Sequence, residues 1–529
     1  MEYCAGSGKL AIGDNMPNGQ LGPEFVSGAR TRTRDALNDR ARRAAAGFKS
    51  LGVSAGGSVA LLLRNEFVFF EATDGARALG AYAVPVNWHL APAEIEFQLN
   101  DCGAAVLVGH ADLLKTCAAI IPEHMTVIAV ETPPELREAY RVDPDGGALA
   151  PGATDWESWL AGFDPLTEPA AAVPESMFYT SGTTGMPKAV KRLAQTPDDA
   201  AHMLAVRDKT YGIRSGCRAL IAGPLYHGAP NAFGIRVSHQ AGKVVMMPRF
   251  DAEQVLALIA EHRIEVAFLV PVMFVRMLKL PDNVRTKYDL SSLTQITTAG
   301  APCPVEIKSR MIDWVGPVIH EFYASTEINY MTNCSSADAV AKPGTVGLPV
   351  DGAMLKIFGE DGSELPTGQP GEIYGRLQRG PDFTYHNREE ARRAIERDGL
   401  VTAGDVGYFD EDGYMFLCDR QKDMVISGGV NIYPAEIEGE LAAMPGVADC
   451  AVFGIPDAEF GEALMVVIEL DSGAEISATD VRNFLSPRLA AFKVPRQIEF
   501  RGDLPRNDSG KIYKRRLRDP YWEGVERRI

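Results

Sequence analysis

Short apolar runs alternate with longer segments of helical spacing along residues 30–108. A continuous apolar run between turn signals is typical of a buried strand, and apolar residues at intervals of three and four indicate an amphipathic helix. Their alternation predicts a parallel sheet with helical crossovers. We expect strands at 59–63, 83–86 and 104–108. We expect helices at 36–48, 67–79 and 92–100.

The same pattern returns further along the chain. Strands are expected at 177–180, 218–223, 266–270, 294–298 and 318–323, with a helix at 252–261. Three of these strands run into loops at 224–227, 299–302 and 324–327. Open parallel sheets bind ligands at the edge formed by the carboxyl ends of their strands, so a site is expected there. Between the two halves, residues 131–172 are rich in proline, glycine and acidic residues and predict a loop-rich connection.

The pattern of apolar and turn-forming residues changes at Thr345. Turn signals at 359–362, 370–371 and 410–413 alternate with short strands and predict a small antiparallel β unit. A polar joint at 420–423 precedes two helices and two strands. We therefore predict an α/β protein with a large N-terminal domain of parallel α/β sheets plus a small β unit, and a small α+β C-terminal domain. The expected divisions are a poorly ordered leader at 1–29, an N-terminal domain at 30–419 and a C-terminal domain at 420–529.

Composition narrows the function classes. The 529 residues exceed the usual size of one core, so two or more domains are expected. A net charge of −17 argues against nonspecific nucleic-acid binding. The eight cysteines form no C-x-x-C pair, so we expect them to be reduced, in the cytoplasm. The nine histidines show no spacing typical of a metal site. The longest apolar run, 266–275, is too short to span a bilayer, and neither a signal peptide nor a peroxisomal address is expected.

A segment rich in glycine and hydroxyl groups runs from Tyr179 to Lys188. Glycines let backbone N–H groups approach an anion, and the hydroxyls add further donors. Lys188 adds a point charge suited to phosphate. The spacing does not match the common P-loop, and a polar surface loop is the alternative. The residues concerned are Thr180, Ser181, Gly182, Thr183, Thr184 and Gly185.

The order of motifs resembles that of the adenylate-forming superfamily, which includes acyl-CoA synthetases, nonribosomal-peptide adenylation domains and firefly-type luciferases. The similarity extends from Arg30 to Arg518 and rests on seven blocks in the family's order. It implies that the C-terminal domain is mobile and rotates between two half-reactions. The blocks lie at 180–188, 300–302, 323–327, 402–405, 420–423, 427–438 and 505–511.

The resemblance implies nucleotide-binding roles in the N-terminal domain. The 180–188 loop would grip the β- and γ-phosphates, with Thr183 among the catalytic residues. Tyr323 would stack on adenine, Thr326 would approach the α-phosphate, and Glu327 would hold Mg²⁺. Asp405 and Arg420 would bind the ribose. The implied lining of the nucleotide site also includes Gly300, Ala301, Pro302, Glu321, Phe322, Ala324 and Ser325.

Two positions depart from the family's pattern. Ala324 stands where glycine is usual and adds one methyl group near the nucleotide or acyl group. Ala403 stands where threonine is usual, so any contact from that hydroxyl is in doubt.

The resemblance places the remaining roles in the C-terminal domain. Lys511 would reach the carboxylate and the α-phosphate, where a cation is needed because two anions meet. Lys422 falls on the hinge position. Ser427, Gly428 and Gly429 would line the path of coenzyme A, since glycine lets the pantetheine arm pass close to the backbone. The cations at 514–518 indicate an exposed basic tail that could steer the phosphates of CoA.

An acyl pocket is expected beside the nucleotide site. By the resemblance, His227 is a gate between the acyl pocket and the thiol tunnel; a structural histidine is the alternative. Apolar side chains near the strand ends would line the cavity, although Val270 and Phe274 are equally compatible with ordinary core packing. The expected lining is His227, Phe233, Val270, Phe274, Gly300 and Phe322.

These observations predict an ATP-dependent, AMP-forming carboxylic acid:CoA ligase that acts on an apolar fatty, aryl or steroid side-chain acid. The expected cofactors are ATP, Mg²⁺ and coenzyme A as co-substrate, with no nucleic acid and no membrane span. The oligomeric state is open between a monomer and a homodimer. The first alternative is a stand-alone acyl-AMP ligase that loads a carrier protein. A noncatalytic nucleotide-binding relative and a luciferase-type oxygenase are more distant alternatives.

Overall fold

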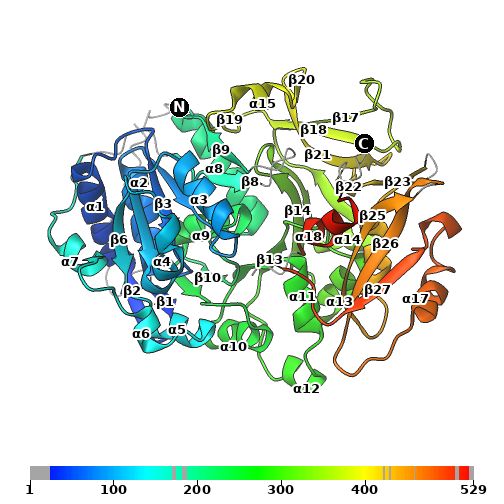
Figure 1. The fold of residues 1–529 in the computed structure, drawn as a ribbon, viewed down its shortest axis with the longest axis horizontal. Helices are drawn as coiled ribbons and strands as arrows, with labels where there is room; N and C mark the ends of the chain where they lie inside the picture. Colours follow the sequence, from blue (N-terminus) through cyan, green and yellow to red (C-terminus); the bar gives the residue numbers. More distant parts are fainter. Residues whose placement is uncertain are drawn as a thin grey trace, which may run out of the picture.

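A computed structural model describes residues 24–168, 174–180, 187–420, 423–427, 430–457, 459–506 and 512–523. Its larger, N-terminal part contains two extended sheets with helices around them, and its C-terminal part contains a smaller sheet (Figure 1). The predicted α/β fold class, with a large parallel-sheet unit followed by a small C-terminal unit, is confirmed.

The first sheet has five parallel strands in the order β4-β3-β5-β6-β7. Its central strands are completely buried, because each is a continuous apolar run of the kind that parallel sheets need on both faces. The strands are β3 (Ser58–Leu62), β4 (Tyr82–Pro85), β5 (Val106–His110), β6 (Thr126–Val130) and β7 (Thr154–Asp155). The helices between them are α1 (Arg34–Ser50), α2 (Phe67–Ala78), α3 (Pro92–Asp101) and α4 (Ala111–Cys117).

The second sheet begins with a parallel half. Its order is β14-β13-β12-β10-β11-β1, so six strand ends lie next to one another at its carboxyl edge. The strands are β1 (Glu24–Ser27), β10 (Arg218–Ile221), β11 (Lys243–Met246), β12 (Val266–Phe268), β13 (Gln295–Thr298) and β14 (Ile319–Ser325). The helices are α8 (Pro197–Tyr211), α9 (Gly228–Gln240), α10 (Ala252–His262), α11 (Pro271–Leu278) and α13 (Val305–Val315).

The predicted small β unit is present, but it continues this second sheet and does not form a sheet of its own. A tight turn after β14 starts an antiparallel strand, and the remaining strands add to it one by one. They are β15 (Asn329–Cys334), β16 (Thr345–Pro349), β22 (Met415–Arg420), β21 (Leu400–Phe409), β18 (Gly371–Leu377) and β17 (Ala353–Phe358). A separate small sheet joins β8 (Phe178–Thr180), β9 (Lys188–Arg192) and β19 (Phe383–Tyr385).

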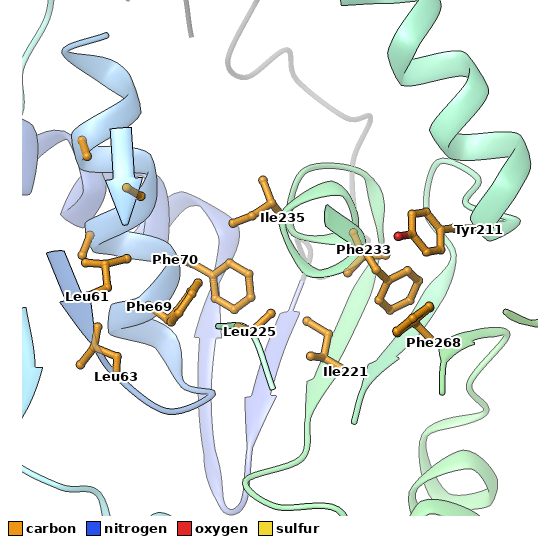
Figure 2. Packing of buried hydrophobic residues seen from close by; sticks show 14 of the residues in the cluster. Leu61, Leu63, Phe69, Phe70, Tyr211, Ile221, Leu225, Phe233, Ile235 and Phe268 are labelled. Carbon is orange, nitrogen blue, oxygen red and sulfur yellow. The ribbon is translucent and has the colours of Figure 1, made fainter. Parts of the chain in front are cut away.

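One apolar core connects the two large sheets. Phe69 and Phe70 of α2 lie beside Leu225 and Ile235, and the cluster continues to Phe233 and beyond (Figure 2). These side chains are at most 7% exposed. Helices of the first sheet therefore pack directly on helices of the second, which fixes the two carboxyl edges relative to each other.

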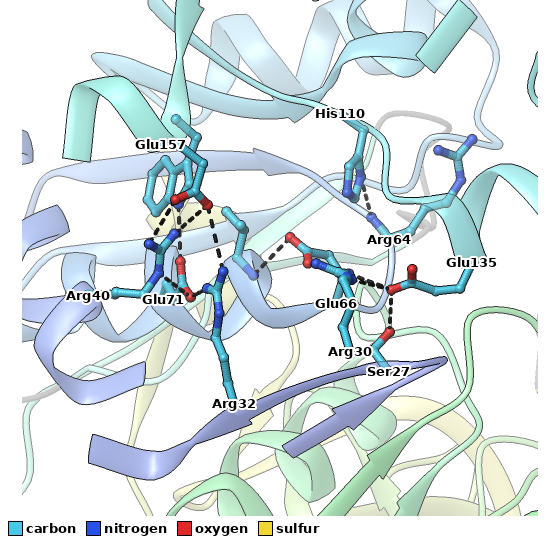
Figure 3. A network of polar contacts seen from close by, with 12 residues as sticks. Ser27, Arg30, Arg32, Arg40, Arg64, Glu66, Glu71, His110, Glu135 and Glu157 are labelled. Carbon is cyan, nitrogen blue, oxygen red and sulfur yellow. Dashed lines mark hydrogen bonds and ion pairs between the residues drawn. The ribbon is translucent and has the colours of Figure 1, made fainter. Parts of the chain in front are cut away.

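The first described residues belong to the fold, although we expected a leader over 1–29. Glu24–Ser27 form β1, parallel to β11, and Phe25 is only 1% exposed. Arg30 and Arg32 of the next strand, β2 (Arg30–Thr33), reach buried Glu66 and Glu71 of the first sheet's helical layer (Figure 3). The sequence alone does not reveal this pairing, because a four-residue strand carries little periodicity. Residues 1–23 lie outside the described residues.

The connection at 131–172, which we expected to be loop-rich, contains short elements. They are α5 (Pro134–Tyr140), α6 (Pro144–Gly147), β7 and α7 (Trp156–Ala161). Asp155 caps α7 by accepting a hydrogen bond from the Ser158 N–H, and Trp156 and Leu160 are buried. The acidic and proline residues that indicated a loop are here helix-start signals.

The C-terminal unit has its own hydrophobic clusters, separate from those of the N-terminal part. Its strands are β23 (Val425–Ser427), β24 (Val430–Ile432), β25 (Val447–Asp457), β26 (Gly461–Leu470) and β27 (Gln497–Arg501). Its helices are α16 (Pro434–Ala442), α17 (Ala478–Leu485) and α18 (Lys514–Arg518). Lys279, just after α11, reaches across to this unit and bonds the Asp471 carboxylate at 2.5 Å. Among the described residues, no helix combines the length and apolar character needed to cross a bilayer.

Candidate active site

Predicted site residues from several strand ends lie along one edge of the second sheet. His227 is the N-cap of α9 after β10, Val270 follows β12, and Gly300 follows β13. Gly300 has φ +88°, in the left-handed region that favours glycine, and a side chain there would lie 4.0 Å from Val270. The expected lining residues Gly300, Ala301 and Pro302 are exposed at this edge. The edge therefore presents backbone and small side chains to a ligand.

Glu327 is presented by a tight turn between β14 and β15. Ser325 pairs with Asn329, and the Ser325 hydroxyl oxygen accepts hydrogen bonds from the N–H groups of Glu327 and Ile328, both at 3.2 Å. The Glu327 oxygen Oε1 accepts from the Thr180 hydroxyl at 3.4 Å and from the Tyr385 hydroxyl at 3.1 Å. The carboxylate thus meets the strand that enters the glycine-rich loop.

The loop itself is described only at its two ends. Thr180 ends β8, and Lys188, which is 9% exposed, begins the returning strand β9. The Lys188 ammonium lies 5.1 Å from the centre of the Tyr385 ring. Ser181, Gly182, Thr183, Thr184 and Gly185 lie outside the described residues.

Tyr323, Asp405 and Arg420 form a chain of polar contacts. The Tyr323 hydroxyl donates to Asp405 at 2.8 Å, and Arg420 donates to the other Asp405 oxygen at 3.2 Å. Burial and the adjacent Asp405 raise the pKa of Tyr323 well above its ordinary value, so the phenol stays protonated. The sequence indicated all three residues, but not the hydrogen bond that holds the tyrosine ring to the aspartate.

The Glu321 side chain is buried behind the site edge and pairs with a helix. It is 3% exposed and forms a buried ion pair with Lys308 of α13. Its carboxylate also accepts a hydrogen bond from the Cys303 N–H at 3.3 Å. Burial raises the pKa of this carboxyl above its usual range. Glu321 therefore supports the loop after β13 from behind, whereas we expected it among the nucleotide ligands.

The expected acyl-pocket residues divide between two clusters. Phe233 and Phe322 belong to an aromatic group with Tyr211 and Phe268, with ring centres 5.4 Å to 6.4 Å apart. Phe274 is completely buried in a different cluster, formed with α10 and α13, and is ordinary core. Val270, half-buried, contacts both clusters.

Part of the C-terminal site is described. Ser427 ends β23 and pairs with Gly461, whereas Lys422, Gly428, Gly429 and Lys511 lie outside the described residues. The base of the segment that carries Lys511 is closed by a bridge between Arg506 and Ile512. Arg506 in turn forms ion pairs with Asp449 and Glu469.

The expected exposed basic tail is only partly exposed. Lys514 bonds Glu438 at 2.8 Å, and this acidic partner raises its pKa. Arg518 lies 3.3 Å from Asp423. Arg515 and Arg516 remain exposed. Helical spacing alone does not indicate which of these cations turn inward.

The sequence missed three residues of the site. Tyr385 contacts Glu327, Lys308 holds Glu321, and Arg192 of β9 donates to the turn that carries Glu327. Tyr385 and Arg192 come from elements that are distant in sequence from Glu327, whereas Lys308 comes from the helix just before β14; no motif signals any of these pairings. Arg192 lies four residues after Lys188, and its position in a strand that returns from a phosphate loop was the one available hint.

Comparisons with known proteins agree with this arrangement. Residues 21–381 match the family model of the AMP-binding enzymes, and residues 436–511 match that of the AMP-binding enzyme C-terminal domain. The chain belongs to the AMP-binding enzyme family. The expected superfamily and enzyme class, the AMP-forming acyl-CoA synthetases, are confirmed at this level.

Individual relatives span nearly the whole chain. A feruloyl-CoA synthase of an Amycolatopsis species is 34% identical over 91% of this chain and 92% of its own length. The long-chain-fatty-acid–CoA ligase FadD13 of Mycobacterium tuberculosis is 32% identical over 92% of each chain. The crystal structure of ATP-bound MatB from Rhodopseudomonas palustris superposes with a TM-score of 0.81 at 27% identity, covering 97% of this chain and 98% of that one.

Proposed function

We propose that this protein joins an apolar carboxylic acid to coenzyme A in two steps, through an acyl-adenylate. The observation that carries the proposal is the convergence of Thr180, Glu327 and the Tyr323–Asp405–Arg420 chain at one sheet edge. In the first step a carboxylate oxygen of the acid attacks the α-phosphorus of ATP, and pyrophosphate leaves. In the second step the CoA thiol loses its proton, its sulfur attacks the acyl carbon, and AMP leaves.

Asp405 is suited to hold the ribose. A carboxylate has about four acceptor positions, and the contacts with Tyr323 and Arg420 use one on each oxygen. Two ribose hydroxyls can therefore still donate to it. The same contacts fix the Tyr323 ring at this edge, where it would stack on adenine.

Glu327 fits a magnesium ion. When bound, the ion supplies positive charge that offsets the charge of the phosphates. Mg²⁺ prefers one or two carboxylates, with phosphate oxygens and water as its other ligands. The hydroxyls of Thr180 and Tyr385 both use Oε1 of Glu327, so neither occupies Oε2. The described residues contain no group of three or more acidic, histidine or cysteine ligands that could hold a metal by themselves.

Catalysis would then be positioning and electrostatic stabilisation, with no covalent enzyme intermediate. Lys511 is our candidate for the cation that approaches the two reacting anions. Its segment starts from a base that two ion pairs of Arg506 hold in place. Such an anchored base allows a lysine to be delivered to the N-terminal edge and withdrawn again when the C-terminal unit rotates.

The acid is proposed to be apolar because of the side chains around the strand ends. Phe233, Phe268 and Phe322 form a buried aromatic cluster, and half-buried Val270 packs against it. A fatty, aryl or steroid side-chain acid that lay against Val270 and this cluster would gain roughly 0.8 kcal/mol for each buried methylene.

We also propose a reducing compartment, the cytoplasm, for this reaction. Seven cysteines are free in the described part of the chain, and six of them are buried. Sedimentation at working concentration distinguishes a monomer from a homodimer.

The deciding experiment is a panel of acids with ATP and Mg²⁺, read by pyrophosphate release, and then by AMP formation with CoA or with a phosphopantetheinylated carrier protein. The panel should run from acetate to long-chain acids and include benzoate, a hydroxycinnamate and a fused-ring acid. We expect acid-dependent pyrophosphate release with apolar acids and thioester formation with CoA. Transfer to the carrier and not to CoA would favour the carrier-loading alternative, and no release with any acid would refute the proposal.

A further inference from the structure

Arg192 is a buried arginine at the end of the strand that returns from the glycine-rich loop. It is 7% exposed, and its carbonyl oxygen accepts a hydrogen bond from the Tyr82 hydroxyl at 2.8 Å. The backbone of β9 is paired on both sides, with β8 and with β19. The side chain therefore leaves from a rigid strand and can transmit that strand's position.

The guanidinium group bonds the turn that presents Glu327. It donates to the carbonyl oxygen of Thr326 at 2.5 Å and to that of Glu327 at 3.1 Å. It also donates to the side-chain oxygen of Asn329 at 2.8 Å and to the carbonyl of Pro381 at 3.3 Å. Only a forked, planar cation can serve four acceptors from one position, which lysine cannot do.

The turn needs such support. Asn329 has φ +64°, a conformation that costs energy in most residues other than glycine, although asparagine tolerates it better than most. Three residues separate the paired Ser325 and Asn329, and Glu327 lies at the middle of them. A shift of either end of this turn moves the Glu327 carboxylate directly.

Arg192 stays charged although it is buried. Burial lowers the pKa of Arg192, while Glu175, Glu327 and Asp382 oppose that effect and Arg207 adds to it. An arginine remains protonated under these conditions. Arg207 is itself buried and paired with Glu175, but the contacts described for it do not reach residues 326–329.

We propose that Arg192 is a positioning residue that couples the strand behind the phosphate loop to the turn that presents Glu327. Through this coupling, the strand that leaves the phosphate loop and the Glu327 carboxylate keep a fixed position relative to each other. The loop can then contact the phosphates while Glu327 contacts the metal. The inference rests on the proposed adenylation function, in which Glu327 meets the metal that accompanies ATP. Arg192 itself touches neither substrate nor metal in this arrangement.

The test compares Arg192→Lys with Arg207→Lys in the full-length enzyme. Both changes keep one positive charge in a buried place, but only the first removes the fork from the turn. A misplaced catalytic group can cost about 10²-fold in rate, so R192K should lower acid-dependent pyrophosphate release about 10²-fold. Conversion of supplied acyl-AMP and CoA to acyl-CoA should fall far less, because that step does not use the metal–phosphate arrangement.

A binding measurement separates positioning from general damage. Mn²⁺ binding in the presence of a nonhydrolysable ATP analogue, followed by electron paramagnetic resonance, should weaken about tenfold in R192K and stay near wild type in R207K. Asn329→Gly offers a second variant in case R192K fails to fold. Glycine accepts the left-handed conformation and removes only the side-chain acceptor, so a smaller loss in the same direction is expected.

The outcomes are distinct. Equal losses in both half-reactions, or the same Mn²⁺ affinity in R192K and wild type, would show that Arg192 only stabilises the fold. The same pattern in R207K would overturn the inference as well. If wild-type enzyme releases no pyrophosphate with any acid, the proposed function itself fails, and the inference fails with it.

Discussion

At the scale of single residues, the side chains proposed to bind the ligand are themselves held in place by hydrogen bonds from other side chains. Tyr323 would stack on the nucleotide, yet its hydroxyl is held by Asp405, and Asp405 also receives Arg420. The Glu327 carboxylate is held in the same way, by hydrogen bonds from the hydroxyls of Thr180 and Tyr385. Sequence motifs identified the groups proposed to meet the ligand, because their types and order are distinctive. The contacts of Tyr323 with Asp405 and of Glu327 with Tyr385 were not predictable, because each joins residues more than 50 positions apart.

A buried histidine gives a prediction about acid stability. His110 is completely buried, and its Nδ1 accepts a hydrogen bond from the Arg64 N–H at 3.1 Å (Figure 3). Burial, and secondarily the Arg64 charge, lower its pKa from 6.5 to about 3, although Asp112 opposes this. Below pH 6.5 the unfolded chain therefore binds a proton at this position that the folded chain refuses, so folding stability falls with acid until about pH 3.

The expected size follows from the slope of about 1.4 kcal/mol per pH unit for one proton. Between pH 7 and pH 5, wild type should lose about 2 kcal/mol of unfolding free energy relative to His110→Asn, whose amide oxygen can accept the same hydrogen bond. Urea unfolding of both proteins at the two pH values measures this difference. An unchanged difference would mean that folding does not lower the pKa of His110.

At the scale of elements, the strands and their loops were predicted more accurately than the way they assemble. Buried strands such as β3 and β5 were found within about two residues of their bounds, because continuous apolar runs mark them. The short strand β1 and helix α7 were missed, since four to six residues carry too little periodicity. Pairings such as β9 with β19 leave no local signal. Phe274 looked like a pocket residue for the same reason: its spacing does not show which face of the sheet it covers.

The aromatic group between α8, α9 and β12 gives a prediction about chain length. Phe233, one of the expected lining residues, packs against Tyr211 and Phe268, and we propose here that it closes the inner end of the acyl pocket. Phe233→Leu should open space for a longer acid. Each additional methylene that fits should then raise kcat/KM roughly fourfold, from about 0.8 kcal/mol of transfer free energy.

Phe274→Leu is the matched control, because Phe274 is equally buried but belongs to the other cluster. Steady-state kinetics with a homologous series of acids would show the optimum moving to longer acids in F233L and staying in place in F274L. A shift of equal size in both variants would place the pocket elsewhere.

At the scale of the whole molecule, the chain consists of a large unit with the site edge and a small unit beyond residues 420–423. The small unit keeps its own hydrophobic clusters. In this structure its edge meets α11 through Lys279 and Asp471, both partly exposed. Exposed ion pairs contribute at most about 1 kcal/mol, so such a contact permits rotation. Composition and motif order predicted the two units, but no sequence pattern predicts which surfaces of them touch.

The expected hinge position, Lys422, gives a prediction at this scale. Lys422→Pro would fix φ near roughly −65° at the joint between the units. If the small unit must rotate between the half-reactions, pyrophosphate release in a single turnover should survive while thioester formation fails. Rapid-quench measurement of both products tests this, with Lys279→Ala as a control that alters the interface but not the joint. An unimpaired overall rate in K422P would place the hinge at another residue.

The long sequence separation between β1 and its parallel partner has a consequence for folding during synthesis on the ribosome. That partner, β11, lies about 220 residues later, with Glu24 opposite Lys243. At the usual 5–20 residues per second, roughly 10–40 s pass between synthesis of the two strands. During that interval Phe25 and Val26, which end up buried, can pair only with the neighbouring strand β2, because the parallel partner of β1 has not yet been made. The nascent chain must therefore carry this apolar strand without its parallel partner until nearly half of the chain has been translated, which makes the segment a natural binding site for a chaperone.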